Sequence, residues 1–497
     1  MRITFIGILA ALFISGCAIF ESDTRRGVRQ CDENNMETRV APSTDLDAPA
    51  VFGPAPSERQ LAWHKLKYYA FIHFGPNTFT DIEWGHGTES PEVFNPLQLD
   101  CRQWAKVIKD AGMEGVIITA KHHDGFCLWP SLHSTHTVRE SAWKEGKGDL
   151  LMELSQACRE FGIRFGVYIS PWDRNHPTYG TDEYNQVFKK MLEEVLTRYG
   201  EVFEVWFDGA CGEGPNGKRQ VYDWPGFVDV VRKFQPRAVI FSDSGPDIRW
   251  IGNEEGYAAE TNWCTVRDKA FYPGIPGRNA QQQTGHEDGD LWLPAEVNTS
   301  IRPGWFYHRS EDDKVKPVNR LIDNWYHSVG MNGNFLLNLP VDDRGLIHEN
   351  DIKALTGLRR HVEEAFSTNL AVDATAIATQ CRSGLKTFDA SKAIDPDPMT
   401  YWATDDHVLK ASFVIEFKEP MDINAVMLQE FIALGQRVES FTIEVWKENT
   451  FEEAAGGTTI GNRRIVRFDT VKTPKLKINI HARACPCISN IEVYRVP

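Results

Sequence analysis

Several common binding signatures are missing from this sequence. The first expected strand leads into His73-Phe74-Gly75-Pro76, which is not the glycine-rich turn of a doubly wound, dinucleotide-binding sheet. The glycine-rich stretch 212–217 lacks the Lys and the Ser or Thr of a phosphate loop. Positive charge is also scarce, because 54 Lys and Arg stand against 69 Asp and Glu, for a net charge of -15. Phosphate recognition needs a positive field, so the composition argues against a nucleic acid or an anionic membrane surface as partner.

The ten cysteines indicate neither a disulfide framework nor a metal centre. Cys17 belongs to a targeting segment, which leaves an odd number, and several of the others fall in expected core elements. Cys485-Pro486-Cys487 has no second pair to complete a zinc site. His122 and His123 are neighbours on an expected strand, where adjacent side chains diverge, so they are poor candidates for binding one ion together. We therefore expect no metal and no cofactor in the catalytic chemistry.

Residues 1–17 are typical of a lipoprotein signal peptide. Met1-Arg2 precedes an apolar run, Ile3 to Ile14, that is too short for a transmembrane helix. Small residues directly before Cys17 resemble a bacterial lipobox, which makes Cys17 the expected lipidated residue. An ordinary cleaved signal with an incidental Cys is the alternative. Residues 18–55 predict a flexible tether, so we expect a lipid-anchored protein of the bacterial cell envelope, with the membrane leaflet left open.

Between residues 56 and 366, strand-like apolar runs alternate with helix-like repeats. Glu114 to Ala120 and Arg164 to Ile169 are two of the expected strands, and Thr181 is the expected cap of the helix that follows them. Strands alternating with helices indicate parallel βαβ units. Polar side chains recur where such strands end, as in a (β/α)₈ barrel, whose strand C-termini form the catalytic face. They are His73, His122, His123, Asp173, Asp208 and Asp243. The expected fold is therefore α/β, with a (β/α)₈-type (TIM-like) barrel over residues 56–366.

From about Ser367 the pattern changes to short strand-like runs separated by turns, with no convincing helix. Residues 367–497 therefore predict a second, all-β domain of the sandwich type.

The stretch Glu204 to Gly209 predicts a strand that ends in a carboxylate. Strand side chains alternate, so Trp206 and Asp208 share one face, and Gly209 lets the chain turn away. An Asp that only caps the next loop is the alternative reading. The 15 Trp suit a neutral, partly apolar ligand, and saccharides fit that description.

Two carboxylates are what glycoside hydrolysis requires, one as nucleophile or base and one as acid. Asp208 is the first candidate. Glu254, at the expected end of a later strand, is the second, with Glu255 and Glu260 as rivals. The two histidines fit best as hydrogen-bonding groups for sugar hydroxyls.

Several of these stretches together resemble the α-L-fucosidases of glycoside hydrolase family 29, over about residues 58–365. Lys121-His122-His123-Asp124-Gly125-Phe126 is the most specific of them. The others are His73-Phe74-Gly75, Glu83-Trp84-Gly85, Tyr168, Trp206-Phe207-Asp208-Gly209 and Asn332-Gly333-Asn334-Phe335-Leu336-Leu337-Asn338. The resemblance implies an exo-acting fucosidase that retains configuration, with Asp208 as nucleophile. It also implies a fucose pocket lined by His73, Glu83, Trp84, His122, His123, Tyr168 and Trp206.

The family varies at the acid/base, so this assignment depends on a local similarity. The stretch 245–254 is similar to the subfamily that acts on α-1,3 and α-1,4 fucosyl linkages in branched glycans, which points to Glu254. The expected partner is therefore a fucosylated oligosaccharide or glycoconjugate. A non-catalytic glycan-binding lipoprotein on the same fold and a barrel glycosidase for another sugar are the alternatives, and the oligomeric state stays open.

The C-terminal stretch 393–404 resembles a discoidin-like (factor 5/8 type C) sandwich. Such modules often bind sugars and could hold a structural calcium through oxygen ligands. A purely structural buttress on the barrel is the alternative.

Overall fold

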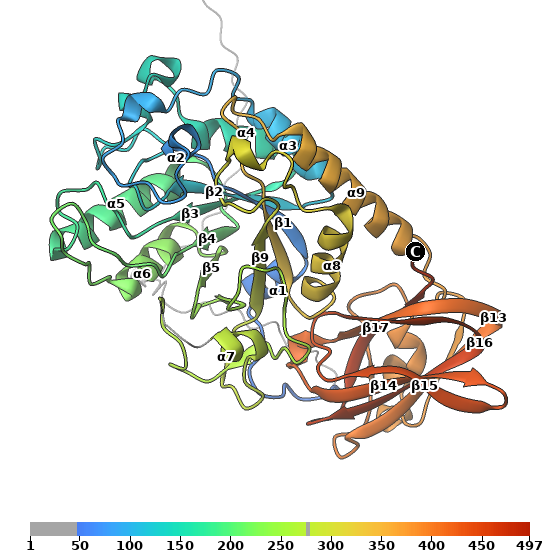
Figure 1. Cartoon of the computed structure of the whole chain (residues 1–497). Helices are drawn as coiled ribbons and strands as arrows, with labels where there is room; N and C mark the ends of the chain where they lie inside the picture. The colour runs from blue at the N-terminus through green and yellow to red at the C-terminus, as the bar shows by residue number, and fades with distance from the viewer. Residues whose placement is uncertain (1–46, 275–278) are drawn as a thin grey trace, which may run out of the picture. The chain divides into compact units, whose positions relative to one another are not determined.

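Eight parallel strands close into a barrel in the computed structural model, which describes residues 47–274 and 279–497 (Figure 1). The order around the barrel is β1-β10-β9-β6-β5-β4-β3-β2. The predicted barrel is therefore confirmed. Its strands are β1 (Tyr68–Ile72), β2 (Gly115–Lys121), β3 (Arg164–Ile169), β4 (Glu204–Trp206), β5 (Val239–Ser242), β6 (Ile248–Trp250), β9 (Ala295–Ser300) and β10 (Asn334–Asn338), and a short pair, β7 (Thr265–Val266) and β8 (Leu291–Trp292), lies outside it.

Helices connect the strands and pack against their outer side chains. In α3, Asp100 caps the helix by accepting from the backbone N–H of Arg102 (2.9 Å) and Gln103 (3.2 Å), while Trp104 and Ile108 are buried against the barrel. The helices are α1 (Glu58–His64), α2 (Pro76–Thr80), α3 (Cys101–Asp110), α4 (Leu150–Phe161), α5 (Asp182–Arg198), α6 (Trp224–Phe234), α7 (Asn279–Thr284), α8 (Val318–Ser328) and α9 (Glu349–Ala365).

Three local predictions differ from the structure. β4 ends at Trp206, so Asp208 follows the strand rather than ending it. β6 ends at Trp250, and Glu254 therefore lies in the loop after the strand. α5 begins after Thr181 as expected, but the Thr181 hydroxyl donates to the Thr178 carbonyl oxygen (2.7 Å) instead of accepting from the helix.

A separate apolar cluster fills the inside of the barrel. Inward positions alternate along a strand, so Glu204 and Trp206 of β4 point into this interior. Trp206 stacks on Phe241 with ring centroids 3.9 Å apart. The cluster includes Trp63, Tyr69, Phe71, Ile117, Tyr168, Trp206, Phe241, Ile248 and Leu336. It forms the floor beneath the C-terminal ends of the strands.

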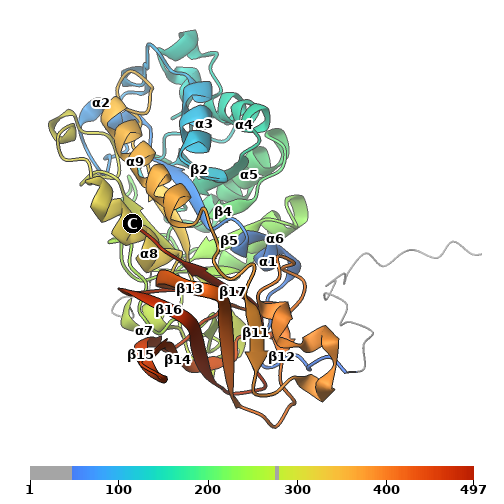
Figure 2. The same ribbon diagram turned by 90° about the vertical axis from the view of Figure 1, so that its right-hand side faces the viewer.

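The chain after α9 forms a seven-stranded antiparallel sheet (Figure 2). The order is β12-β17-β13-β16-β14-β15, and β11 pairs with β13. The long β13–β16 ladder changes register twice, and the inward side chains of the domain form their own apolar core. The all-β prediction for this domain is confirmed. Its strands are β11 (Thr375–Ala378), β12 (Trp402–Ala403), β13 (Lys410–Glu430), β14 (Val438–Lys447), β15 (Thr450–Gly457), β16 (Arg464–Ala482) and β17 (Cys487–Tyr494).

Hydrogen bonds join the barrel segment 258–264 to the C-terminal domain. The backbone N–H of Asn262 donates to Thr459 Oγ1 (2.9 Å), and that of Cys264 donates to Gln436 Oε1 (2.7 Å). Asn262 and Cys264 are both buried. The C-terminal domain therefore supports a segment that closely follows Glu254 in the chain.

The predicted lipidation site, Cys17, and most of the predicted tether lie outside the described residues. Within residues 47–274 and 279–497, no helix is long and apolar enough to cross a membrane.

Candidate active site

The carboxylate of Asp208 is oriented at both of its oxygens. The Tyr168 hydroxyl, on β3, donates to Oδ2 (3.0 Å), and the backbone N–H of Ala210 donates to Oδ1 (2.8 Å). His123 Nε2 lies 3.7 Å from Oδ2, and the Asp208 side chain remains 27% exposed. Burial, and then the Asp208 charge, raise the pKa of Tyr168 well above its usual value, so Tyr168 stays a donor at neutral pH. An accessible carboxylate held in one orientation is what a nucleophile requires.

Three buried histidines, from the ends of β1 and β2, lie beside this carboxylate. His73 Nδ1 is hydrogen-bonded to Asn338 Oδ1 (2.8 Å), and His123 Nδ1 to Ser170 Oγ (2.8 Å). Burial lowers the pKa of His73 to about 3 and that of His123 to about 4, so both rings are neutral at pH 7. His122 Nδ1 is buried and meets no hydrogen-bonding partner in the described part of the chain. A neutral imidazole offers one donor and one acceptor, which suits sugar hydroxyls.

Two indoles predicted for the pocket occupy different depths. Trp206 is buried in the floor, where its N–H donates to Glu296 Oε1 (2.8 Å), so only its ring can meet a ligand. Trp84 is 54% exposed and meets the His123 ring edge-on at 5.4 Å between centroids. Trp84 is therefore placed at the rim, while Trp206 is placed beneath the site.

Glu254 lies within electrostatic reach of Asp208. Its Oε2 accepts from the indole N–H of Trp305 (3.2 Å). Burial raises the pKa of Glu254, and the charges of Asp208 and Glu83 raise it further, while the Trp305 hydrogen bond opposes them. A carboxyl group with a raised pKa beside a second carboxylate has the properties of a general acid.

The two rival carboxylates point elsewhere. Glu254 and Glu255 are both exposed, but the charge of Glu255 acts on Tyr257, and its backbone bridges to Thr299. Glu260 forms an ion pair with Arg464 of the C-terminal domain (3.4 Å), and its backbone oxygen also accepts from Arg464 (2.6 Å). The geometry therefore favours Glu254 over both.

Both carboxylate oxygens of Glu83 accept hydrogen bonds from the loop after β9. They accept from the backbone N–H groups of Trp305 (3.1 Å) and Phe306 (3.0 Å), and His308 Nε2 lies 2.8 Å from Oε1. The structure therefore gives Glu83 a positioning contact to the loop after β9. A direct contact with fucose stays a prediction.

Sequence reasoning missed the loop after β9 and the residues behind the histidines. Trp305 packs beside His73 (5.1 Å between centroids) and binds Glu254, while Asn338 and Ser170 hold the histidines. A tryptophan shortly after an expected strand was the available signal for Trp305. Nothing in the sequence pattern distinguished Asn338 or Ser170 from other polar strand-end residues.

Gly209, next to the candidate nucleophile, is required by close packing rather than by its backbone angles. A Cβ there would lie 2.2 Å from the backbone nitrogen of Gly274 and 2.3 Å from Asp243 Oδ2. Burial, and then the Asp208 charge, raise the pKa of Asp243 to about 6, while a hydrogen bond from Gly274 opposes them. A second carboxyl group with a raised pKa therefore borders the site.

Comparison with known proteins matches this barrel to one family. The family model "Alpha-L-fucosidase" matches residues 56–365, which carry the eight barrel strands and the candidate site residues. The chain belongs to the α-L-fucosidases of glycoside hydrolase family 29. The predicted resemblance is thereby confirmed, and the protein is a glycoside hydrolase.

Relatives of this α-L-fucosidase extend over nearly the whole chain. "Alpha-L-fucosidase 1" of Arabidopsis thaliana is 42% identical over 453 residues, covering 90% of this chain and 88% of the relative. A putative α-L-fucosidase structure from Bacteroides thetaiotaomicron is 37% identical with a TM-score of 0.83, covering 90% and 99% of the two chains. A Ruminococcus gnavus family 29 fucosidase in complex with fucose is 32% identical with a TM-score of 0.84, covering 90% and 96%.

The C-terminal sheet of this fucosidase matches a second family model, "F5/8 type C domain", over residues 374–493. The structural calcium expected there gains no support. Across residues 47–274 and 279–497, no group of three or more His, Cys, Asp or Glu side chains is arranged to hold a metal ion.

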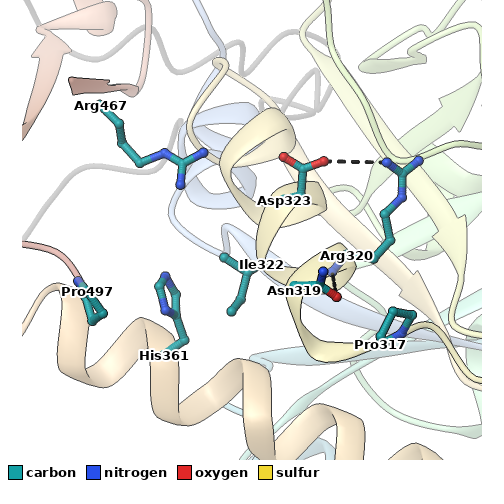
Figure 3. Close-up of a pocket in the computed structure, with 8 residues that line it drawn as sticks. All are labelled: Pro317, Asn319, Arg320, Ile322, Asp323, His361, Arg467 and Pro497. Atoms are coloured by element: carbon teal, nitrogen blue, oxygen red, sulfur yellow. Dashed lines mark hydrogen bonds and ion pairs between the residues drawn. The ribbon is translucent and has the colours of Figure 1, made fainter. Parts of the chain in front are cut away.

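A pocket of about 670 Å³ is lined by residues of α8, α9, β16 and the C-terminus (Figure 3). Two of its side chains, Arg320 and Asp323, form an ion pair (3.5 Å). It is lined by Pro317, Asn319, Arg320, Ile322, Asp323, His361, Arg467 and Pro497. None of these is a candidate site residue, so the chemistry is assigned to the barrel mouth instead.

Proposed function

We propose that this family member is an exo-acting, retaining α-L-fucosidase that removes α-1,3- or α-1,4-linked fucose from branched glycans. The observation that carries the proposal is Asp208, accessible and fixed by Tyr168 and Ala210, with Glu254 near enough for its pKa to respond to the Asp208 charge. Two carboxyl groups in different environments are the requirement for acid-assisted displacement.

In the first step, Asp208 Oδ attacks the anomeric carbon of the fucosyl residue. The bond to the leaving oxygen breaks, and Glu254 gives that oxygen its proton. A covalent fucosyl-enzyme of inverted configuration and a free acceptor sugar result. The neutral histidines and the ring of Trp206 hold the fucose during this step, because neither group adds a charge that would compete with Asp208.

In the second step, Glu254 is a carboxylate and removes a proton from water. The water oxygen attacks the anomeric carbon, the bond to Asp208 breaks, and fucose leaves with its original α configuration. Two inversions therefore give net retention, and both carboxyl groups return to their starting protonation states.

The linkage preference is supported by the stretch 245–254, which forms β6 and the loop that carries Glu254. A loop beyond a barrel strand can contact the sugar that follows fucose, and that binding energy can be used to orient the bond. Fucose linked to a branched GlcNAc is the substrate class that we propose.

We also propose that Cys17 is lipidated and that the enzyme is held in the bacterial cell envelope. The support is the apolar run and the small residues before Cys17. Mass spectrometry of the N-terminal peptide from membranes would reveal a diacylglyceryl cysteine, whereas an unmodified peptide cleaved elsewhere would refute the anchor.

Fucose release from a panel of fucosylated oligosaccharides tests the activity, with Asp208→Ala as the inactive control. NMR of the first product should show α-L-fucose. β-L-Fucose as first product would rule out retention. Equal kcat/KM on α-1,2-linked fucosyl-lactose and on a Lewis-type trisaccharide would contradict the linkage preference. Binding without release would instead favour a glycan-binding protein, and release of another sugar would favour a different glycosidase.

A further inference from the structure

Trp305 connects the fucose side of the site to the candidate acid. Its ring packs beside His73, and its N–H donates to Glu254 Oε2 (3.2 Å). Its backbone is held on both sides, because its carbonyl oxygen accepts from Asn338 Nδ2 (2.8 Å) and its N–H donates to Glu83 Oε2 (3.1 Å). The position of the Glu254 carboxylate therefore depends on a loop that Glu83 fixes.

Glu83 is in turn held by His308, which lies between two carboxylates. His308 Nε2 is 2.8 Å from Glu83 Oε1, and Nδ1 is 2.5 Å from Asp81 Oδ1. A ring that meets a carboxylate at each nitrogen must donate from both, so the geometry requires the imidazolium form.

The surroundings of His308 are consistent with that charge. Burial lowers the pKa of His308, but the hydrogen bonds and charges of Asp81 and Glu83 outweigh burial and raise it. The other charged groups of this turn are bound elsewhere: Arg309 pairs with Asp343 (2.8 Å), and Glu311 accepts from the backbone N–H of Gly304 (3.1 Å).

We propose that His308, between Asp81 and Glu83, is a positioning residue that fixes Trp305 and thereby the carboxyl group of Glu254. His308 touches no reacting atom in this proposal. The inference rests on the proposed acid/base role of Glu254. It also explains how a residue in the loop after β6 is held in a fixed position relative to Asp208. It also gives Glu83 a function that does not require contact with sugar.

The effect of losing the His308 contacts should depend on the leaving group of the substrate. A sugar leaving group needs a proton from a well-placed acid, whereas fluoride leaves without one. Loss of the His308 contacts should therefore slow the release of fucose from an oligosaccharide. It should spare the first step on α-L-fucosyl fluoride, in which fluoride leaves as the fucosyl-enzyme forms.

The test compares His308→Gln with Arg309→Gln in the full chain, on a Lewis-type trisaccharide and on α-L-fucosyl fluoride. Arg309 is the matched control, because it lies on the same turn and its ion pair with Asp343 is exposed. For His308→Gln we expect kcat on the trisaccharide to fall by about 10- to 100-fold, part of the effect of a general acid, with KM changed by less than about threefold. The burst of fluoride release, which reports the first step alone, should change little, and Arg309→Gln should resemble the wild type on both substrates.

A double mutant separates this proposal from the one on which it rests. If His308 acts through Glu254, adding His308→Gln to Glu254→Ala should cause no further loss on the trisaccharide. Losses that multiply in the double mutant, or a burst of fluoride release that slows as much as the trisaccharide reaction, would overturn the positioning role. If Glu254→Ala itself shows no dependence on the leaving group, the acid/base assignment fails first. Trp305→Phe keeps the ring but removes the N–H, and it should reproduce the leaving-group pattern even if the His308 variant folds poorly.

Discussion

The indole N–H of Trp206 donates to the Glu296 carboxylate over 2.8 Å, inside the barrel and beneath the candidate site. The Tyr69 hydroxyl donates to the other Glu296 oxygen. Glu204 is fully buried, and it lies close enough to this carboxylate for the Glu296 charge to act on it. Burial and the neighbouring charge therefore favour the protonated form of Glu204.

This pair predicts a pH dependence of stability. Burial, and then the Glu296 charge, raise the pKa of Glu204 well above its usual 4.5. The folded state therefore binds more protons than the unfolded state, and the contribution of Glu204 is complete below about pH 4.5 and is lost as the pH rises toward the folded pKa. Glu204→Gln keeps a neutral donor, so we expect its free energy of unfolding to fall less between pH 5 and pH 7.5 than that of the wild type.

Urea unfolding at the two pH values measures the difference. Glu201→Gln is the control, because that carboxylate, just before β4, is 67% exposed. If the free energy of unfolding changes equally between pH 5 and pH 7.5 in the wild type and in Glu204→Gln, Glu204 is ionised in the folded protein.

The second prediction concerns the alkaline limb of activity. The Trp305 hydrogen bond lowers the pKa of Glu254 against burial and the Asp208 charge. Trp305→Phe should therefore raise this pKa and keep Glu254 protonated to higher pH. We expect the decrease of kcat/KM at alkaline pH, measured on an oligosaccharide, to occur at higher pH than in the wild type, even though the maximal rate falls.

Trp172→Phe is the matched control for that profile. Its indole also lies at the mouth of the barrel, but its N–H donates to the Glu213 carbonyl oxygen (3.1 Å). The pH at which kcat/KM decreases should therefore stay as in the wild type. A shift of this decrease to lower pH in Trp305→Phe would contradict the prediction. It would mean that exposing Glu254 to water lowers its pKa more than losing the indole donor raises it.

The third prediction concerns the contact between the two domains. Thr459 is buried and accepts from the backbone N–H of Asn262 (2.9 Å), so Thr459→Val leaves a buried donor without a partner. We expect a loss of about 1–3 kcal/mol in unfolding free energy. Thr450→Val, at an exposed position, should change it by less than about 0.5 kcal/mol. No loss for Thr459→Val would mean that the segment 258–264 does not depend on the C-terminal domain.

Much of the barrel could be predicted from the sequence because its strands are continuous apolar runs. β2 is buried along its whole length, as parallel barrel strands are, and polar residues begin where such runs stop. Asp208, His122 and His123 could be proposed for that reason, since the ends of parallel strands meet at one face.

The loop residues could not be found in this way. Trp305, His308 and Glu83 come together only through the path of the loop after β9, and no periodicity encodes that path. Glu204 looked like the ordinary start of a strand, because its role depends on Glu296 across the barrel. Glu254 was proposed from its place at the expected end of a strand and from local similarity, whereas its partner Trp305 emerged only in three dimensions.

The last prediction is that Glu254, and neither Glu255 nor Glu260, is the general acid/base. Glu254→Ala should abolish most hydrolysis of an oligosaccharide, by roughly 10²- to 10⁴-fold, because the leaving sugar then departs without a proton. α-L-Fucosyl fluoride should still form the fucosyl-enzyme at Asp208, after which hydrolysis is slow because water has no base. Added azide needs no base, so it should restore turnover and give α-fucosyl azide, the product of two inversions.

Glu255→Ala and Glu260→Ala are the matched controls for this experiment. The charge of Glu255 acts on Tyr257 and not on the site, so its loss should leave both rates near those of the wild type. Glu260→Ala breaks the ion pair with Arg464 and should lower stability modestly without changing the response to azide. If azide rescues Glu260→Ala or Glu255→Ala but not Glu254→Ala, the acid/base lies elsewhere in the loop after β6. That result would also remove the reason for Trp305 to hold Glu254, because the indole would then be fixing a carboxylate that takes no part in proton transfer.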